Sequence, residues 1–298
     1  MGENIKPGSN GNGNGHHHDG EGWSEPRLDL STHVAVVTGG FRGIGRATSI
    51  MLAREGARAV GVVDMAPELG EFCTEANRRL GRDAFVPFNG DVTDAAFRRH
   101  VFTSMEKSHG PVSICIPAAG ITRDRLAVRV LKESGDVDIY PESDWERVIA
   151  VDLTAPVYWG LETIASVART RGKAGLKRWD PSENVQGCVV FIGSVSSSGN
   201  RGQVSYATAK AGLEGAQGTL AAEGVYHGVR CAIIHPGYTD TAMVRALGDE
   251  FIRQNIIPQT QLRRLIKPEE IANAILFLIR NPAISGQLWA DAGWHPVA

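Results

Sequence analysis

Tyr206 and Lys210 are the residues of this sequence whose types and spacing most directly suggest chemistry. They stand four residues apart at the start of a stretch rich in alanine and leucine, which favours a helix. Residues four apart share one face of a helix, so this spacing places a phenol beside an ammonium group. Because a nearby cation favours the phenolate, we expect Lys210 to lower the pKa of Tyr206 from its ordinary value of about 10. A phenol whose pKa is lowered in this way is suited to general acid–base catalysis.

Hydroxyl side chains precede this pair. Ser194 lies twelve residues before Tyr206 and could donate a hydrogen bond to a carbonyl oxygen, and Ser196 is the rival candidate for that role. A tyrosine–lysine pair by itself is also typical of an ordinary surface helix, since short motifs often match by chance. The case for a catalytic site therefore depends on a second motif, near the other end of the chain.

A glycine-rich turn supplies that second motif. The apolar stretch 34–38 predicts a strand, Gly39, Gly43 and Gly45 follow it, and the pattern over 46–55 predicts a helix. A strand, a glycine turn and a helix place backbone N–H groups against a pyrophosphate, although the glycine spacing differs from the commonest Gly-x-Gly-x-x-Gly fingerprint. The alternative is a plain connector between two elements.

Asp64 favours the nucleotide interpretation. It ends a second apolar stretch, 59–63, and stands nineteen residues after Gly45. An acidic residue at about this distance, at the carboxyl end of a strand, can accept hydrogen bonds from an adenosine ribose. The alternative is a turn or cap residue. The glycine turn and Asp64 together predict a dinucleotide cofactor.

Strand and helix patterns alternate through the rest of the chain. This alternation predicts a single doubly wound (Rossmann) α/β domain with a parallel sheet over residues 31–298. Ser143 and Glu146 fit a capping box at the start of a long helix, and the polar stretch 126–141 is expected to form a loop. The expected strands are 34–38, 59–63, 84–88, 112–117, 187–193 and 229–235, and the expected helices include 46–55, 68–80 and one that Thr93 or Asp94 caps and that ends at 109.

Composition argues against several classes of function. The chain has 298 residues, is 42% hydrophobic and carries a net charge of −2, which predicts a globular protein without a basic surface for nucleic acid or a membrane. Four widely spaced cysteines without a CxxC pair, and the lack of a signal-peptide pattern, favour a reducing, cytoplasmic compartment. We expect residues 1–30 to form a disordered Gly/Asn-rich tail, in which the histidines at 16–18 are a polar segment and not a metal site.

The two motifs occur together in a known family. Thr38-Gly39-x-x-x-Gly43-x-Gly45 with Tyr206-x-x-x-Lys210 resembles the short-chain dehydrogenase/reductase family over about residues 30–298. The runs 119–124 and 193–195 are similar to its 3-oxoacyl-(acyl-carrier-protein) reductase branch. The resemblance implies hydride transfer between the nicotinamide C4 and a secondary alcohol or ketone.

The resemblance also implies roles for individual residues. Tyr206 would move the proton, Lys210 would lower its pKa and hold the ribose, and Ser194 would orient and polarise the carbonyl. Asp91 and Val92 would meet the adenine ring, and Thr239, with Thr241 as its neighbour, would meet the nicotinamide carboxamide. The full set of implied cofactor contacts is Gly39, Arg42, Gly43, Ile44, Gly45, Asp64, Asp91, Val92, Ala118, Ala119, Gly120, Tyr206, Lys210, Pro236, Gly237, Thr239 and Thr241.

Two positions depart from the family pattern. Asp152 stands where the family has a catalytic Asn that holds a water beside the lysine. Asp can accept the same bonds but adds a negative charge near Lys210, and we keep it as a catalytic candidate; its alternative role is structural. Pro117 and Ala118 stand where the family has two Asn residues that brace the sheet, and we expect a local difference there without loss of cofactor binding, because small residues still let the cofactor approach.

The choice of cofactor depends on two residues. Asp64 would repel the 2′-phosphate of NADP, which carries about −1.5 to −2 charge by analogy with protein phosphates. Arg42 could instead pair with that phosphate, and the acyl-carrier reductase branch uses NADP. We expect NAD, with NADP as the alternative.

The substrate class stays open in the sequence. The candidates are a 3-oxoacyl thioester, a polyol and a hydroxysteroid, and the alternative of another class is a nucleotide-sensing or scaffolding protein whose chemistry has lapsed. We expect the segment near 239–267 to form a lid over the substrate. We also expect a homo-oligomer, a tetramer or a dimer, in which the long stretch 169–187 is either a subunit contact or a surface loop.

Overall fold

The computed structural model describes residues 28–294 of the chain. Most of the expected tail, residues 1–27 with the three histidines, lies outside the described residues. The described part begins beside the core, because Leu30 is buried in a short 3₁₀ turn, η1 (Leu30–Thr32).

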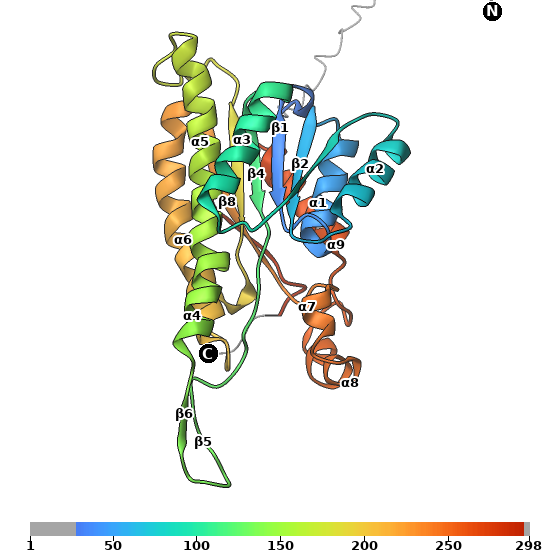
Figure 1. Ribbon diagram of the computed structural model, residues 1–298, viewed down its shortest axis with the longest axis vertical. Helices are drawn as coiled ribbons and strands as arrows, with labels where there is room; N and C mark the ends of the chain where they lie inside the picture. Colours follow the sequence, from blue (N-terminus) through green and yellow to red (C-terminus); the bar gives the residue numbers. More distant parts are fainter. Residues whose placement is uncertain (1–27, 295–298) are drawn as a thin grey trace, which may run out of the picture.

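A seven-stranded parallel sheet forms the centre of the protein (Figure 1). Its strand order is β3-β2-β1-β4-β7-β8-β9, so the chain builds outward from β1 in one direction and then crosses over to build in the other. This is the doubly wound α/β fold that the alternation of patterns predicted. The strands are β1 (Val34–Thr38), β2 (Ala59–Asp64), β3 (Phe85–Asn89), β4 (Val112–Pro117), β7 (Gly187–Ile192), β8 (Val229–Pro236) and β9 (Gln287–Ala290).

Burial explains which strands were easy to recognise. All residues of β1, β4, β7 and β8 are buried, as expected for parallel strands that are covered on both faces. Cys115, Cys188 and Cys231 lie in three adjacent strands of this group and behave as small apolar residues. The edge strands β3 and β9 alternate between more buried and more exposed residues.

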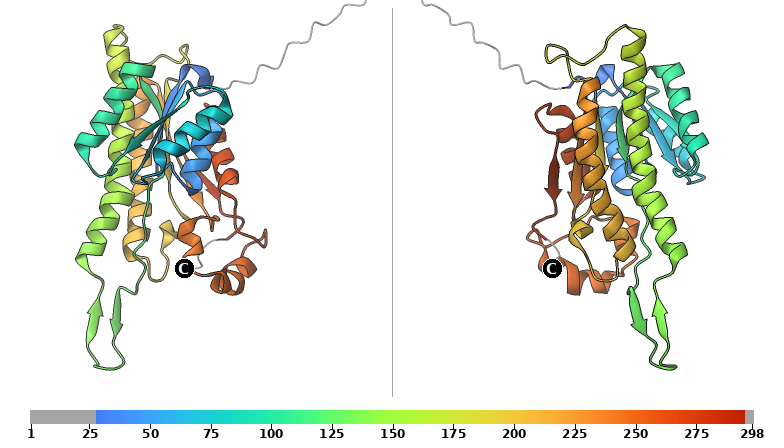
Figure 2. Two further views of the ribbon diagram at one scale, coloured as in Figure 1. Left: turned by 45° about the vertical axis from the view of Figure 1, so that its right-hand side comes forward. Right: turned by 90° about the vertical axis from the view of Figure 1, so that its left-hand side faces the viewer.

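Two layers of helices cover the sheet (Figure 2). One face packs against α1 (Gly43–Arg54), α2 (Leu69–Leu80) and α9 (Pro268–Arg280). The other face packs against α3 (Ala95–His109), α5 (Ala155–Lys173) and α6 (Val204–Gly224), with the buried Trp159 of α5 at its centre. Of the two predicted caps, Thr93 and Asp94, it is the Asp94 carboxylate that caps α3.

One helical stretch, Glu142–Lys173, is long and apolar enough to cross a membrane by length and composition alone. It comprises α4 (Glu142–Ile149), a π-helical turn η2 (Ala150–Thr154) and α5. In this protein it packs against β4 and β7 of the sheet, and 44% of its most apolar window is buried. This is the usual environment of a core helix in an α/β domain.

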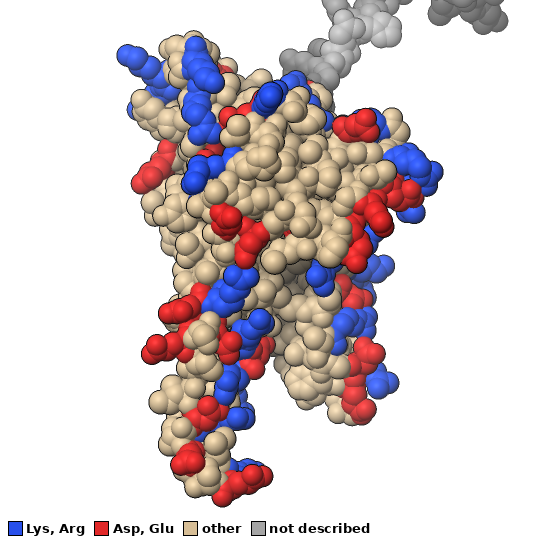
Figure 3. Space-filling view, viewed as in Figure 1, with Lys and Arg blue, Asp and Glu red and all other residues tan. Residues whose placement is uncertain are grey.

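Two excursions of the chain stand beyond the carboxyl ends of the strands (Figure 1). One is a β-hairpin, β5 (Val128–Val130) with β6 (Val137–Ile139), and the other is the segment that contains α7 (Ala242–Arg245) and α8 (Asp249–Phe251). Figure 3 shows the surface hollowed between these two excursions. The expected lid therefore lies across a hollow from the hairpin.

Two local expectations were wrong. The stretch 126–141 is not an irregular loop, because residues 128–130 and 137–139 pair as antiparallel strands; Val128, Val130, Val137 and Ile139 share the apolar face of this hairpin and are all exposed. Ser143 does not cap α4. That helix begins at Glu142, the residue before it is the extended Pro141, and no side chain caps it.

Candidate active site

Tyr206 and Lys210 lie in the first two turns of α6, on the side of the helix that faces the end of β7. The Lys210 ammonium nitrogen lies 5.4 Å from the centre of the Tyr206 ring, and the lysine is only 4% exposed. The helix thus places the phenol and the ammonium side by side, as their spacing predicted.

The pKa of Tyr206 differs from the expectation. Burial raises it above the ordinary value of about 10, and this effect exceeds the lowering by Lys210. The Asp152 carboxylate raises the pKa further, whereas a hydrogen bond with the Ser194 side chain lowers it. Lys210 acts in the predicted direction, but the sequence could not reveal how far the surrounding packing desolvates this half-buried phenol. The prediction of a net lowering was therefore wrong for this structure.

Ser194 lies in the turn directly after β7, close to Tyr206. Its hydroxyl accepts a hydrogen bond from the Ser196 N–H at 3.0 Å and so caps the short 3₁₀ turn η3 (Val195–Ser198). The same hydroxyl also forms a hydrogen bond with the Tyr206 side chain. The Ser196 hydroxyl instead lies near the Asn200 side-chain amide, 3.4 Å away. Of the two rival serines, Ser194 is the one that the fold brings to the tyrosine.

The Lys210 ammonium has two partners in this region. It donates a hydrogen bond to the Ile192 carbonyl oxygen at 3.0 Å, and it lies 3.4 Å from Oδ2 of Asp152. Asp152 belongs to the π-helical turn η2 and is completely buried, with Oδ1 accepting a hydrogen bond from the Ile121 N–H at 2.9 Å. Single π-helical turns of this kind are frequent at functional sites. The structure therefore places Asp152 in direct contact with the lysine.

Two charges share this buried space, and the lysine acts on the carboxylate. Burial raises the pKa of Asp152, while the Lys210 ammonium and the Ile121 N–H oppose that change. The fit is close: a Cβ on Gly120 would lie 2.9 Å from Oδ2 of Asp152, so a larger residue there would displace the carboxylate. The pair is thereby confined between the end of β4 and α6.

The glycine turn after β1 has the shape of a phosphate cradle. Gly39 has a φ of +63°, and a Cβ there would lie 2.8 Å from the Ala119 backbone. A Cβ on Gly45 would lie 2.2 Å from the Gly39 carbonyl oxygen. Helix α1 begins at Gly43, so its first N–H groups have no partner within the helix and point out of its end. These features fit the pyrophosphate of a dinucleotide, which would approach the main chain closely here.

The structure also brings distant predicted contacts to this turn. A Cβ on Gly43 would lie 3.1 Å from a methyl carbon of Thr241, so the loop after β8 touches the glycine turn. The Thr241 hydroxyl caps α7, and the hydroxyl of the buried Thr239 donates to the Gly237 carbonyl at 3.0 Å. Pro236 ends β8, directly before these residues.

Asp64 and Arg42 lie beside the same turn. The Asp64 carboxylate accepts hydrogen bonds from three main-chain N–H groups, those of Phe41 at 3.1 Å, Met65 at 2.8 Å and Ala66 at 3.1 Å. This carboxylate therefore stays at the carboxyl end of β2, and it also braces the glycine turn. Arg42 precedes α1 and is exposed.

The remaining implied contacts line the ends of β3 and β4. The Asp91 carboxylate accepts from the N–H and the hydroxyl of Thr93, and Val92 is buried, with its carbonyl accepting from the Trp159 indole. Ala118, Ala119 and Gly120 follow β4. The Thr38 hydroxyl accepts from the Ala119 N–H at 3.1 Å and braces β1 to this segment. Sequence reasoning identified the missing Asn pair but missed this bond.

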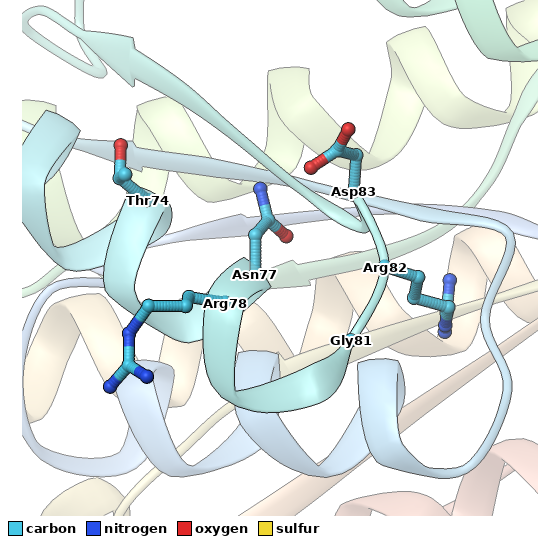
Figure 4. A pocket seen from close by; sticks show the side chains of 6 residues that line it. All are labelled: Thr74, Asn77, Arg78, Gly81, Arg82 and Asp83. Carbon is cyan, nitrogen blue, oxygen red and sulfur yellow. The ribbon is translucent and has the colours of Figure 1, made fainter.

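The described surface also has two depressions. One, of about 450 Å³, adjoins it and is lined partly by Gly43 and Thr241. The other, of about 470 Å³, lies at the end of α2 (Figure 4). Its Arg78 pairs with Glu75, and its Arg82 donates to carbonyls at and just after the end of α1, so these side chains serve the fold. Within residues 28–294 no group of three or more His, Cys, Asp or Glu residues could hold a metal.

Comparison with known proteins identifies the class to which this fold and site belong. The short chain dehydrogenase family model matches residues 33–251, and the chain belongs to that family of oxidoreductases, which bind a nicotinamide cofactor. It is 32% identical over 279 residues to the 3-oxoacyl-(acyl-carrier-protein) reductase FabG of Escherichia coli strain K12, with 91% of this chain and 100% of that protein covered. It is 34% identical over 272 residues to the acetoacetyl-CoA reductase of a Synechocystis species, with 90% of this chain and 98% of that protein covered.

Solved structures agree with this assignment. A putative gluconate dehydrogenase from Agrobacterium tumefaciens superposes with a TM-score of 0.73 at 27% identity, with 89% of this chain and 96% of that chain covered. A short-chain type dehydrogenase/reductase from Mycobacterium marinum superposes with a TM-score of 0.74 at 22% identity, with the same coverage, and supports the fold alone.

Proposed function

We propose that this protein interconverts a secondary alcohol and a ketone, using a nicotinamide dinucleotide that passes a hydride at C4. The observation that carries the proposal is the convergence of the Ser194 hydroxyl, the Tyr206 phenol and the Lys210 ammonium at the carboxyl ends of the strands, next to the glycine turn. In open α/β sheets, ligands bind outside this end of the sheet.

The three side chains divide the work on the substrate oxygen. In reduction, the Tyr206 hydroxyl gives its proton to that oxygen, and in oxidation the phenolate removes it. Ser194 donates a hydrogen bond to the same oxygen as negative charge develops there. The Lys210 ammonium favours the phenolate and would hold the ribose, while Asp152 neutralises part of its charge.

We further propose that the substrate is a 3-oxoacyl thioester. The names of the relatives that match along nearly the whole chain support this choice, since one acts on acyl groups of a carrier protein and the other on an acyl-CoA. A polyol is the second candidate, which the name of the gluconate dehydrogenase neighbour favours, and a hydroxysteroid is the third. Turnover should be measured with acetoacetyl-CoA, a polyol panel and hydroxysteroids. Activity on polyols or steroids without activity on thioesters would contradict the thioester assignment.

NAD is the cofactor that we propose, with NADP as the alternative. The fixed carboxylate of Asp64 at the end of β2 supports this choice, because it would repel a 2′-phosphate, whereas the exposed Arg42 could pair with one. Comparison of kcat/KM with NADH and NADPH tests the assignment. A strong preference for NADPH would refute it.

A sensor or scaffold that binds the dinucleotide without turnover is the alternative of another class. Asp152 in place of the usual Asn favours it, and the presence of Ser194, Tyr206 and Lys210 together argues against it. Titration calorimetry with NAD and NADP, run beside the turnover assays, separates the two: binding without turnover would support the sensor. We also expect the protein to be cytoplasmic and to form a homo-oligomer. Light scattering would measure its oligomeric state.

A further inference from the structure

His235 lies directly beneath the turn that presents Ser194. It is the seventh residue of β8, and its ring is completely buried. The ring stacks on Trp289 of β9, with the centroids 4.2 Å apart and the planes within 15° of parallel. Its Nδ1 lies 3.2 Å from the main-chain oxygen of Ser194. From the sequence, this histidine had no role beyond ending a strand.

The contact with Ser194 indicates which ring nitrogen carries the proton. A carbonyl oxygen can only accept a hydrogen bond, and it lies closer to the ring than the Glu214 carboxylate, so we assign the proton to Nδ1. The Ser197 hydroxyl is a more distant neighbour of Nδ1, at 3.4 Å. Nε2 faces Glu214 of α6, 4.0 Å from Oε1. Burial lowers the pKa of His235, which keeps the ring neutral at physiological pH.

The turn that bears Ser194 is held by several hydrogen bonds. The Gly193 N–H donates to the Ile234 carbonyl at 2.8 Å, and Lys210 holds the Ile192 carbonyl. The pairing of β7 with β8 ends at Ile192, so beyond Gly193 the strand ladder no longer supports the chain. At Ser194 itself, the carbonyl accepts from the Ser197 N–H at 3.0 Å inside the turn, and His235 supplies the contact that joins this carbonyl to β8.

The residue before Ser194 is adapted to this ring. A Cβ on Gly193 would lie 2.5 Å from Nδ1 and 2.7 Å from Cε1 of His235. Any other residue at position 193 would push the imidazole away from the Ser194 carbonyl. The glycine and the histidine thus form one arrangement, in which the ring sits directly against the backbone that carries the serine.

We propose that His235 is a positioning residue for Ser194: its Nδ1–H donates to the Ser194 carbonyl and so fixes the backbone from which the serine hydroxyl reaches the substrate. The proposal rests on the function proposed above, in which that hydroxyl polarises the carbonyl. A displacement of about 1 Å at a reacting group can lower the rate about 100-fold, so a single main-chain bond at this point can matter for turnover.

Two variants separate positioning from space filling. His235→Phe keeps a ring that can stack on Trp289 but has no donor, whereas His235→Asn places an amide donor near the position of Nδ1. We expect His235→Phe to lower kcat by about tenfold or more, with the cofactor Kd from titration calorimetry unchanged, and His235→Asn to recover a large part of that loss. Wild-type kcat in His235→Phe, or equal losses in both variants, would overturn the proposal.

The loss must also depend on the serine. In a Ser194→Ala background, His235→Phe should lower kcat by less than about twofold more, because the hydroxyl that it positions is already gone. Equal losses in both backgrounds would show a general effect on the fold instead. His33→Asn is the matched control. It changes a buried histidine that contacts Ser113 at the amino end of the sheet, and it should lower the melting temperature without changing kcat.

A readout without turnover tests the bond itself. Nitrogen-15 NMR of the wild-type protein should show the His235 Nδ1 protonated and its Nε2 unprotonated. If the wild type turns over no alcohol or ketone, the proposed function fails, but the ring nitrogens still decide whether His235 holds the Ser194 carbonyl. A proton on Nε2 with a bare Nδ1 would overturn the inference whatever the activity.

Discussion

At the scale of single residues, the site is a small set of buried groups whose charges act on one phenol. Lys210 lowers the pKa of Tyr206, whereas burial, Asp152 and Asp124 raise it, and burial is the largest of these effects. The net result is a pKa of Tyr206 above its ordinary value. Such a group is suited to donate a proton to a developing alkoxide, and it needs a further positive charge nearby to lose that proton readily.

Removal of the phenol hydroxyl should abolish most of the activity. We expect Tyr206→Phe to lower kcat by about 10² or more, the scale of lost general acid–base catalysis, while the fold remains. Steady-state kinetics measures the loss, with circular dichroism as the control for folding. A variant that turns over at nearly the wild-type rate would remove Tyr206 from the mechanism.

Replacement of Asp152 tests the influence of its charge. Asp152→Asn removes one of the groups that raise the pKa of Tyr206 and leaves the lysine cation in place. Since oxidation of an alcohol needs the phenolate, the rising limb of kcat/KM against pH should move to lower pH. Asp136→Asn, in the exposed tip of the hairpin, serves as the control. A shift to higher pH, or none, would contradict the assigned contact.

At the scale of elements, two short pieces of irregular backbone determine the geometry of the site. The glycine turn lets β1 pass directly into α1, and it brings the Gly39 backbone close to the Ala119 backbone. The π-helical turn between α4 and α5 directs Asp152 inward, toward Lys210. The glycine turn could not take a residue with a side chain at position 39, because its Cβ would collide with the Ala119 backbone.

The glycine turn offers a direct test by substitution. Gly39→Ala would place a Cβ on a backbone with a φ of +63°, 2.8 Å from Ala119, and should lower stability by about 1 kcal/mol or more and weaken cofactor binding. Gly215→Ala is the matched control. It lies in the interior of α6 with open space around it, and should raise stability by up to about 1 kcal/mol. Thermal unfolding and calorimetry would reveal the contrast, and equal effects would contradict it.

At the scale of the whole molecule, two layers of helices cover the sheet, and the two excursions at one end leave a hollow between them. Buried polar groups within this frame couple its stability to pH. His33, at the amino end of β1, contacts the Ser113 hydroxyl at 2.7 Å, and burial lowers its pKa to about 4.

This histidine should weaken the fold in mild acid. Because the folded pKa of about 4 lies below the unfolded value of 6.5, the unfolded chain binds the proton first as the pH falls. The contribution of the neutral His33 to the free energy of unfolding is fully present above pH 6.5 and is lost toward pH 4. It amounts to at most about 3 kcal/mol. Urea unfolding at a series of pH values should show this loss in the wild type and a smaller one in His33→Asn. Identical pH dependence in both proteins would refute it.

The sequence by itself was sufficient for the doubly wound sheet, the glycine turn and the tyrosine–lysine pair. Each of these depends on local periodicity or on short spacings, and the chain carries such patterns in the order of its residues. The hairpin at 128–139 was missed because its apolar face is exposed, which removes the usual link between apolar alternation and a buried strand face.

Only the tertiary structure decided the environment of the site. The raised pKa of Tyr206, the contact of Asp152 with Lys210, the bond from Thr38 to Ala119 and the position of His235 under Ser194 all join residues that are distant in the chain, or depend on burial. Burial and long-range contacts come from the packing of whole elements. No spacing of residue types along the chain encodes how much water that packing leaves around a given atom.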